Sequence, residues 1–308
     1  MGRTTAAVER TLPNLTHGQG TGLVLLTGVV FSFGGLAFRS TEASSAWEYL
    51  TFRGLGMLAV TSVIFIVQNR HRLDVVRSRF QPIHIAIGLM LAAMNALFIV
   101  ALEFTTVAFV LFLQPVAPIA AAYFSWAIMR ERVSRLVIST TMVTIVGVGV
   151  MVSGTLADDL SAKGLIALLI PLFFGFYTTT VRSSAVIDPS VPVITAGVAL
   201  VGAGLVITAF SGGIDVPLRD ALIGLLAGSI LLGLPVAVFN TAQRVVPSPE
   251  TALLLMVEVL LAPLWVWIFV DEEPPVSTLL GGTIILGAVI WLTLHRAPRP
   301  GRSFSSRG

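Results

Sequence analysis

Ten apolar stretches run through the chain, and its basic residues occur almost only in every second gap between them. Each stretch is close to the roughly 20 residues that a helix needs to cross the hydrocarbon core of a bilayer. The predicted spans are 22–38, 47–67, 83–103, 106–129, 136–153, 164–182, 191–210, 220–242, 250–270 and 277–295. The pattern therefore predicts a bundle of ten transmembrane helices joined mostly by short loops.

The composition points to the same fold class. Of the 308 residues, 55% are hydrophobic and 11% are charged, whereas soluble domains carry about 25% charged residues. The chain has no cysteine, which excludes disulfides, thiolate nucleophiles and cysteine metal sites. The formal net charge of +3 is explained by arginines in cytoplasmic segments rather than by a nucleic-acid partner. We expect an all-α membrane protein in the plasma or inner membrane, surrounded by the lipid bilayer.

The basic residues also predict an orientation, because loops rich in Lys and Arg stay in the cytoplasm. With the N-terminus inside, all 19 Lys and Arg residues lie in cytoplasmic segments except Arg39, Lys163, Arg219 and Arg53. Of these four, the first three fall in external gaps and Arg53 falls within a span. Both termini are therefore predicted to be cytoplasmic. Residues 1–21 form a disordered tail in this prediction, and 296–308 form a basic tail.

Five spans in each half give the two halves, 22–153 and 164–295, opposite orientations in the membrane. One constant offset in residue number aligns Glu131 with Glu272 and Trp126 with Trp267, although it does not align Pro118 with Pro263. Inverted repeats of this kind place a substrate site near the middle of the membrane, where the halves meet.

Two long segments resemble a known family. The run MNALFIVALEFTTVAFVLFLQPVAPIAAAYFSWAIMRER, from Met94, resembles the segment from span three to span four of the EamA family, in the drug/metabolite transporter superfamily. The run FNTAQRVVPSPETALLLMVEVLLAPLWVWIFVDEEPP, from Phe239, is similar to the matching segment of the second repeat. Arg53, in WEYLTFRGLGML, matches an arginine common in span two, whereas Arg130 and Asp271 replace the usual small residue before the closing acid. The resemblance covers about 22–295 and implies a ten-span, inverted-repeat carrier of small metabolites, often directed outward.

Glu258 is the foremost candidate for a functional side chain. It lies midway along the ninth predicted span, in LLLMVEVLLAPLW, with apolar residues on both sides. A charge at that depth costs several kcal/mol unless it faces a cavity or a partner, so such groups are functional candidates by default. Glu258 is either a proton-coupling or cation-binding carboxylate in the pathway, or a structural carboxylate that is hydrogen-bonded to a neighbouring helix.

Arg53 is the second charged candidate, in the outer part of the second span. A guanidinium suits the recognition of a substrate carboxylate or phosphate. The alternatives are an ion pair with Glu48 or Glu103, or extension of the side chain to the membrane interface.

Polar and aromatic side chains complete the candidate pathway. Asn95 and Gln114 lie deep in the third and fourth spans, where they either line a cavity or hydrogen-bond between helices. Tyr177 and Trp265 are candidates for an aromatic wall that selects the shape of a ligand. Gly224 and Gly228 form a GxxxG motif, which is typical of close packing within a bundle and is also compatible with a homodimer.

Prolines predict where the helices are interrupted, because proline removes a backbone hydrogen bond. In a membrane such interruptions are tolerated where the freed carbonyl groups meet protein or a wet cavity. They therefore favour a gated pathway, although isolated kinks also occur in inert bundles. The predicted helix breaks are at Pro115, Pro118, Pro171, Pro235 and Pro263.

No motif for an enzyme or a pump is present. The sequence contains no HExxH motif and no glycine-rich phosphate loop, and its four histidines lie in tails, loops or span ends. We therefore expect no catalytic residue, no metal and no cofactor. The leading hypothesis is a secondary transporter that exports small organic metabolites or drugs, driven by proton exchange or by facilitated diffusion. The alternatives are a structural or receptor subunit of the membrane and a membrane-embedded enzyme.

Overall fold

The computed structural model describes residues 15–42, 44–69, 82–104, 110, 113–153, 164–183, 188, 190–270 and 276–295. All regular secondary structure in these ranges is helical, and no strand occurs among them. The predicted all-α fold class is confirmed for this part of the chain.

Helices follow one another along both halves of the chain. The first half contains α2 (His17–Phe31), α3 (Gly34–Arg39), α4 (Ala46–Asn69), α6 (Pro82–Phe104), α8 (Val116–Met129) and α9 (Arg135–Val152). The second half contains η2 (Gly164–Leu168), α10 (Leu169–Ser183), α11 (Ser190–Phe210), α12 (Leu218–Leu226), η3 (Ala227–Gly233), α13 (Leu234–Ala242), α14 (Ser248–Leu254), α15 (Val257–Val270) and α16 (Val276–Leu294).

Within the described residues, seven helical segments are long and apolar enough to cross a membrane: His17–Arg39, Ala46–Gln68, Pro82–Phe104, Ile166–Ser183, Ser190–Phe210, Leu218–Ala242 and Ser248–Phe269. Three further apolar helices are shorter: Val116–Met129, Arg135–Val150 and Leu279–Leu294. The protein is therefore a multi-pass membrane protein. The shorter helices coincide with the predicted fourth, fifth and tenth spans, so the total of ten crossings stays a prediction.

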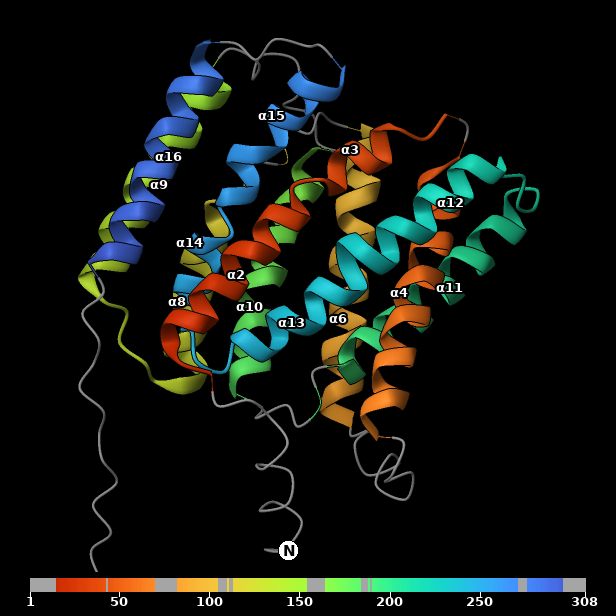
Figure 1. Cartoon of the computed structure of the whole chain (residues 1–308), viewed down its shortest axis with the longest axis horizontal. Coiled ribbons are helices and arrows are strands. Elements are labelled where there is room, and N and C mark those ends of the chain that lie inside the picture. Colours follow the sequence, from red (N-terminus) through yellow and green to blue (C-terminus); the bar gives the residue numbers. More distant parts are fainter. Residues whose placement is uncertain are drawn as a thin grey trace, which may run out of the picture.

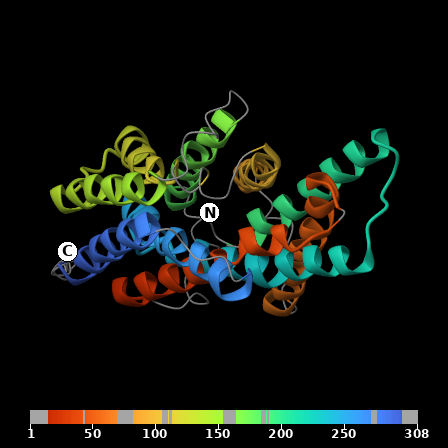
Figure 2. The ribbon, with the colours of Figure 1, turned by 90° about the horizontal axis from the view of Figure 1, so that it is seen from above.

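The helices of the two halves pack against one another across the whole bundle (Figure 1). The pair α9 and α16 lies at one edge, and α4 with α11 and α12 lies at the opposite edge. Between these edges, α2 packs on α13, α6 packs on α10, and α8 packs on α14. Figure 2 shows the same order from above. Each of these contacts joins one half of the chain to the other, so the halves share a single interior.

The register of the last helices repeats between the halves. The offset that relates Glu131 to Glu272 also carries Val116–Met129 onto Val257–Val270, so α8 and α15 begin and end at matching positions. The same offset carries Arg135, where α9 begins, onto Val276, where α16 begins. The weak internal sequence similarity thus coincides with helices that lie at matching positions in the two halves of the chain.

Glycines allow α4 to lie directly against the segment from α12 to η3. A Cβ atom on Gly228 would overlap the backbone carbonyl of Arg53, and one on Gly224 would lie 2.8 Å from the Cβ of Phe52. A larger side chain at either glycine would separate the two helices. The two glycines of the GxxxG motif therefore contact another helix of the same chain, and this contact sets the position of Arg53.

Helices are interrupted at places that only partly coincide with the prolines. Pro118 lies within the first turn of α8, where a missing N–H breaks no helical bond. Pro171 and Pro235 lie inside longer helical segments, just after η2 and η3 continue without a gap into α10 and α13. Pro115 immediately precedes α8, after the turn at Gln114. In contrast, Pro263 lies inside α15, and the interruption of that span comes earlier, at 255–256. Residues 227–233 form a π-helix directly before α13, an arrangement frequent at functional sites.

Candidate functional site

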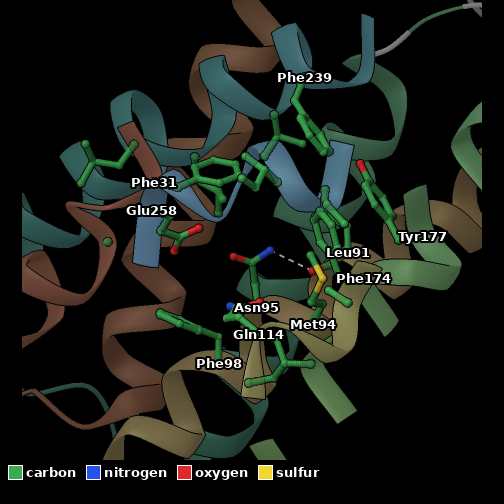
Figure 3. Close-up of a pocket in the computed structure, with 18 of the residues that line it drawn as sticks. Phe31, Leu91, Met94, Asn95, Phe98, Gln114, Phe174, Tyr177, Phe239 and Glu258 are labelled. Atoms are coloured by element: carbon green, nitrogen blue, oxygen red, sulfur yellow. Dashed lines mark hydrogen bonds between the residues drawn. The ribbon is translucent and has the colours of Figure 1, made fainter. Parts of the chain in front are cut away.

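A central cavity of about 100 Å³ lies between the two halves of the chain. A space of this size is larger than one water molecule needs. Its lining includes five of the six side chains that the sequence singled out as a pathway: Arg53, Asn95, Gln114, Tyr177 and Glu258. Helices distant in sequence thus bring these polar groups to one place, which Figure 3 shows in part.

Trp265 is not among the residues that line the cavity. Its indole Nε1–H donates a hydrogen bond of 2.6 Å to Oγ of Ser32, and its ring stacks on Phe33 with centroids 4.4 Å apart. Both partners belong to the short interruption between α2 and α3. The structure therefore places Trp265 where it holds that interruption against α15.

Arg53 reaches the cavity from α4 and is only 5% exposed. Its Nε and Nη1 atoms are fully buried and have no hydrogen-bond partner among the described residues, and its guanidinium lies 6.0 Å from the ring centroid of Tyr49. Burying unsatisfied charged donors is costly, so an arrangement of this kind requires an explanation.

The two acids that the sequence offered as partners for Arg53 bind backbone groups instead. Glu103 accepts a hydrogen bond of 2.7 Å from the N–H of Ala46, at the beginning of α4. Glu48 accepts one of 2.8 Å from the N–H of Ser45 and one of 3.2 Å from the N–H of Asp215. Both carboxylates thus hold the N-terminal end of α4 rather than pairing with the guanidinium.

Glu258 is the second residue of α15 and is half-buried. The chain leaves α14 through a turn at 255–256, and the N–H of Glu258 donates to the carbonyl of Leu255 at 2.9 Å. A carboxylate in the first turn of a helix is favoured by the positive end of the helix dipole. Figure 3 shows the carboxylate pointing into the space beside Phe31 and Asn95. When Glu258 is ionised, its carboxylate is near enough to Arg53 for the two opposite charges to attract each other.

Asn95 and Gln114 add hydrogen-bonding groups to the same space. Asn95 is 6% exposed, and its Nδ2 donates to the carbonyl of Leu91 at 2.9 Å, which leaves its Oδ1 able to accept from another group. Gln114 lies in the turn before α8, where its backbone carbonyl accepts from the N–H of Ala117 at 2.8 Å. Both amides come from the first half of the chain.

Aromatic side chains close one end of the cavity. The hydroxyl of Tyr177 donates to Oδ1 of Asn240 at 2.6 Å, so this phenol ties α10 to α13. Phe239 lies between two other rings, with centroids 6.1 Å from Phe174 and 6.5 Å from Phe31. Only Tyr177 of this group was predicted. The three phenylalanines carried no signal in the sequence, because phenylalanines facing lipid and phenylalanines facing a cavity have the same hydropathy.

A second, more polar pocket of about 270 Å³ lies at the ends of α8, α10 and α14 that the arginine pattern assigns to the cytoplasm. Arg182 of α10 forms two hydrogen bonds with the carboxylate of Glu131 beside it, one of them 2.8 Å long. His17, at the start of α2, lies 3.3 Å from Oε2 of Glu250 in α14. Both contacts join the first half of the chain to the second.

Comparison with known proteins agrees with this architecture. The sequence model of the EamA-like transporter family matches residues 162–294. A solved crystal structure, described only as a protein, superposes with a TM-score of 0.76 at 16% identity, over 91% of this chain and 98% of the other. At that identity it shows a shared fold alone. The comparison with curated proteins found no match.

Proposed function

We propose that the chain is a secondary transporter of the EamA-like family, in the drug/metabolite transporter superfamily, and that it exports small organic solutes. The model of that family matches residues 162–294. The observation that carries this proposal is the pair of opposite charges, Arg53 and Glu258, in a cavity between the two halves. Intramembrane ionisable groups that face a cavity mark solute and ion pathways. For a purely structural subunit we would expect a packed interior rather than a cavity lined by two charged side chains.

We further propose ten membrane crossings in two inverted repeats, 22–153 and 164–295, with both ends of the chain in the cytoplasm. Two observations support this. A single offset relates α8 to α15, and the start of α9 to the start of α16. In addition, Figure 1 shows α2 beginning and α16 ending on the same side of the bundle.

In the proposed cycle the cavity is reached alternately from the two sides of the membrane. The ion pair Glu131–Arg182 and the contact between His17 and Glu250 join the halves on the proposed cytoplasmic side, and both must separate before the cavity opens there. An apolar layer of Ala117, Ala121, Ala252 and Phe174 borders the cavity. Glu258 is the coupling carboxylate, Arg53 binds the solute, and Asn95, Gln114 and Tyr177 complete the polar lining.

A growth-protection screen tests the proposal. Cells that express the protein, its Glu258→Gln variant or its Glu42→Gln variant are challenged with amino acids, sugars, nucleobases, organic acids and toxic cations. Glu42 is an exposed surface residue paired with Arg219, so its variant is a matched control. We expect protection by the wild type and the control, and about ten-fold weaker protection by Glu258→Gln, as for loss of a charge that carries a transport step.

Two results would count against the proposal. Equal protection by Glu258→Gln would remove the coupling role of that carboxylate. Cells that remain as sensitive as those without the protein, across the whole panel, would favour the non-transporting alternatives.

A further inference from the structure

The guanidinium of Arg53 has buried donors that the described part of the protein does not satisfy. Nε carries one N–H and Nη1 carries two, and both atoms are fully buried without a partner there. Arg53 lines the cavity, but these two atoms have almost no exposed surface, so a movement of the guanidinium toward the cavity is needed to bring them to an acceptor on a bound molecule. An oxyanion accepts charge-assisted hydrogen bonds from a guanidinium better than any neutral group does.

The rest of the cavity suits an apolar body. Phe31, Phe98 and Phe174 come from three different helices and surround the same space, together with Met94 and Leu91. A solute that fits this lining has one anionic end and an aliphatic or aromatic remainder. A carboxylate is the simplest such end, since its two oxygens match the fork of a guanidinium.

Glu258 competes with such a solute for Arg53. The titratable groups that face Arg53 in the described lining and on its own helix are Glu258 from α15, Tyr177 from α10 and Tyr49 from α4. One buried cation cannot balance two carboxylates in a medium of low dielectric constant. The empty cavity is neutral when Glu258 is ionised beside Arg53, and the loaded cavity is neutral only when Glu258 holds a proton.

We infer that the cavity binds an organic monocarboxylate together with a proton on Glu258, so that anion and proton travel in the same direction without net charge. This inference rests on the proposed transport function and names its substrate class and its coupling. In proton exchange the solute would instead displace the proton from Glu258. In a zwitterion carrier an ammonium group of the solute would pair with the ionised Glu258.

Binding to the purified full-length protein in lipid nanodiscs tests the inference. Benzoate, phenylacetate and hexanoate are titrated calorimetrically at pH 6, 7 and 8, beside their primary amides and benzylamine. We expect each carboxylate to bind at least about ten-fold more tightly than its amide. We also expect the affinity of the wild type for benzoate to fall by up to about ten-fold for each unit by which the pH is raised, because proton uptake accompanies binding.

Substitutions at Glu258 and Arg53 test the contributions of the two charged side chains separately. Glu258→Gln should bind benzoate with an affinity independent of pH and, at pH 8, at least about ten-fold tighter than the wild type. Arg53→Gln should lose the preference for benzoate over benzamide. Arg53→Lys, which keeps the charge but has fewer donors, should keep part of that preference and serves if the glutamine variant does not fold. Glu42→Gln and Arg219→Gln, on the surface, should bind as the wild type does.

Three results would overturn the inference: tighter binding of benzylamine than of benzoate, no preference for any carboxylate over its amide, or loss of benzoate binding in Glu258→Gln. None of these measurements requires transport. If the cavity is reached from both sides of the membrane but does not bind carboxylates, only the proposed substrate class is contradicted. The transporter proposal would then stand.

Discussion

Glu258 and Ala117 hold equivalent positions in the two halves. Each is the second residue of a helix, α15 or α8, that begins beside the cavity, and the offset that relates Glu131 to Glu272 also relates these two residues. The first turn of a helix favours a negative charge, but only Glu258 supplies one. The two halves therefore present similar helices to the cavity, and single residues on those helices determine its chemistry. A family match predicts the helices more reliably than it predicts the solute.

Tyr177 is predicted to contribute to stability through its hydroxyl. Replacement by phenylalanine removes the 2.6 Å hydrogen bond to Asn240 and keeps the ring that lines the cavity. We expect a loss of about 1 kcal/mol in the free energy of unfolding, the usual net worth of such a bond. Thermal unfolding in detergent measures it, with Tyr123→Phe as the control, since Tyr123 is 60% exposed. An equal loss in both variants would contradict this role.

Trp265 gives a second test at the same scale. Phenylalanine at this position keeps an aromatic ring against Phe33 but loses the hydrogen bond to Ser32. We expect a loss of about 1 kcal/mol in stability and no change in which solutes are transported, because Trp265 lies outside the cavity lining. An altered solute profile with unchanged stability would restore Trp265 to the pathway.

At the scale of helices, the contact between α4 and η3 decides where Arg53 lies. Gly228→Ala introduces a Cβ that overlaps the carbonyl of Arg53, and neither backbone can yield as a flexible side chain would. We expect a destabilisation of about 1–3 kcal/mol, typical of overpacking, measured by thermal unfolding. In Gly202→Ala the new Cβ meets nothing within 4 Å, so stability should stay constant or rise by up to about 1 kcal/mol.

Helix interruptions were only partly predictable from the sequence. Pro118 lies at the start of α8, whereas Pro171 and Pro235 lie just after the points where η2 and η3 become α-helix. The turns at 32–33 and 255–256 contain no proline. The first precedes a Gly-Gly pair, which is a weak local signal. The second lies among fully buried residues, so the surrounding packing decides it.

The polar residues of the cavity were easier to predict than its apolar ones. Arg53 and Glu258 are conspicuous in the sequence because a charge within an apolar span is rare and costly. Phe31 and Phe239 are not, because hydropathy treats the lipid and the interior of a bundle as the same solvent. Which face of a helix meets the cavity depends on contacts between residues far apart in the chain.

At the scale of the whole molecule, closure on the proposed cytoplasmic side depends on ion pairs between the halves. Glu131→Gln or Arg182→Gln removes a bidentate pair whose groups are partly shielded from water. Weakening the closed state by about 1 kcal/mol raises the population of the open state about five-fold. The natural chain contains no cysteine, so a single cysteine placed at Met94, which lines the central cavity, reports on access.

The measurement is the rate at which an impermeant maleimide, added to the cytoplasmic face of membrane vesicles, labels Met94→Cys. We expect about five-fold faster labelling in each single variant and the original rate in the exchanged pair Glu131→Arg with Arg182→Glu, since the exchange restores opposite charges. Arg219→Gln, which breaks an ion pair with Glu42 outside this pocket, is the control and should change nothing. If the exchanged pair were labelled as fast as the single variants, the groups would act separately, and closure would depend on the apolar layer around Phe174 instead.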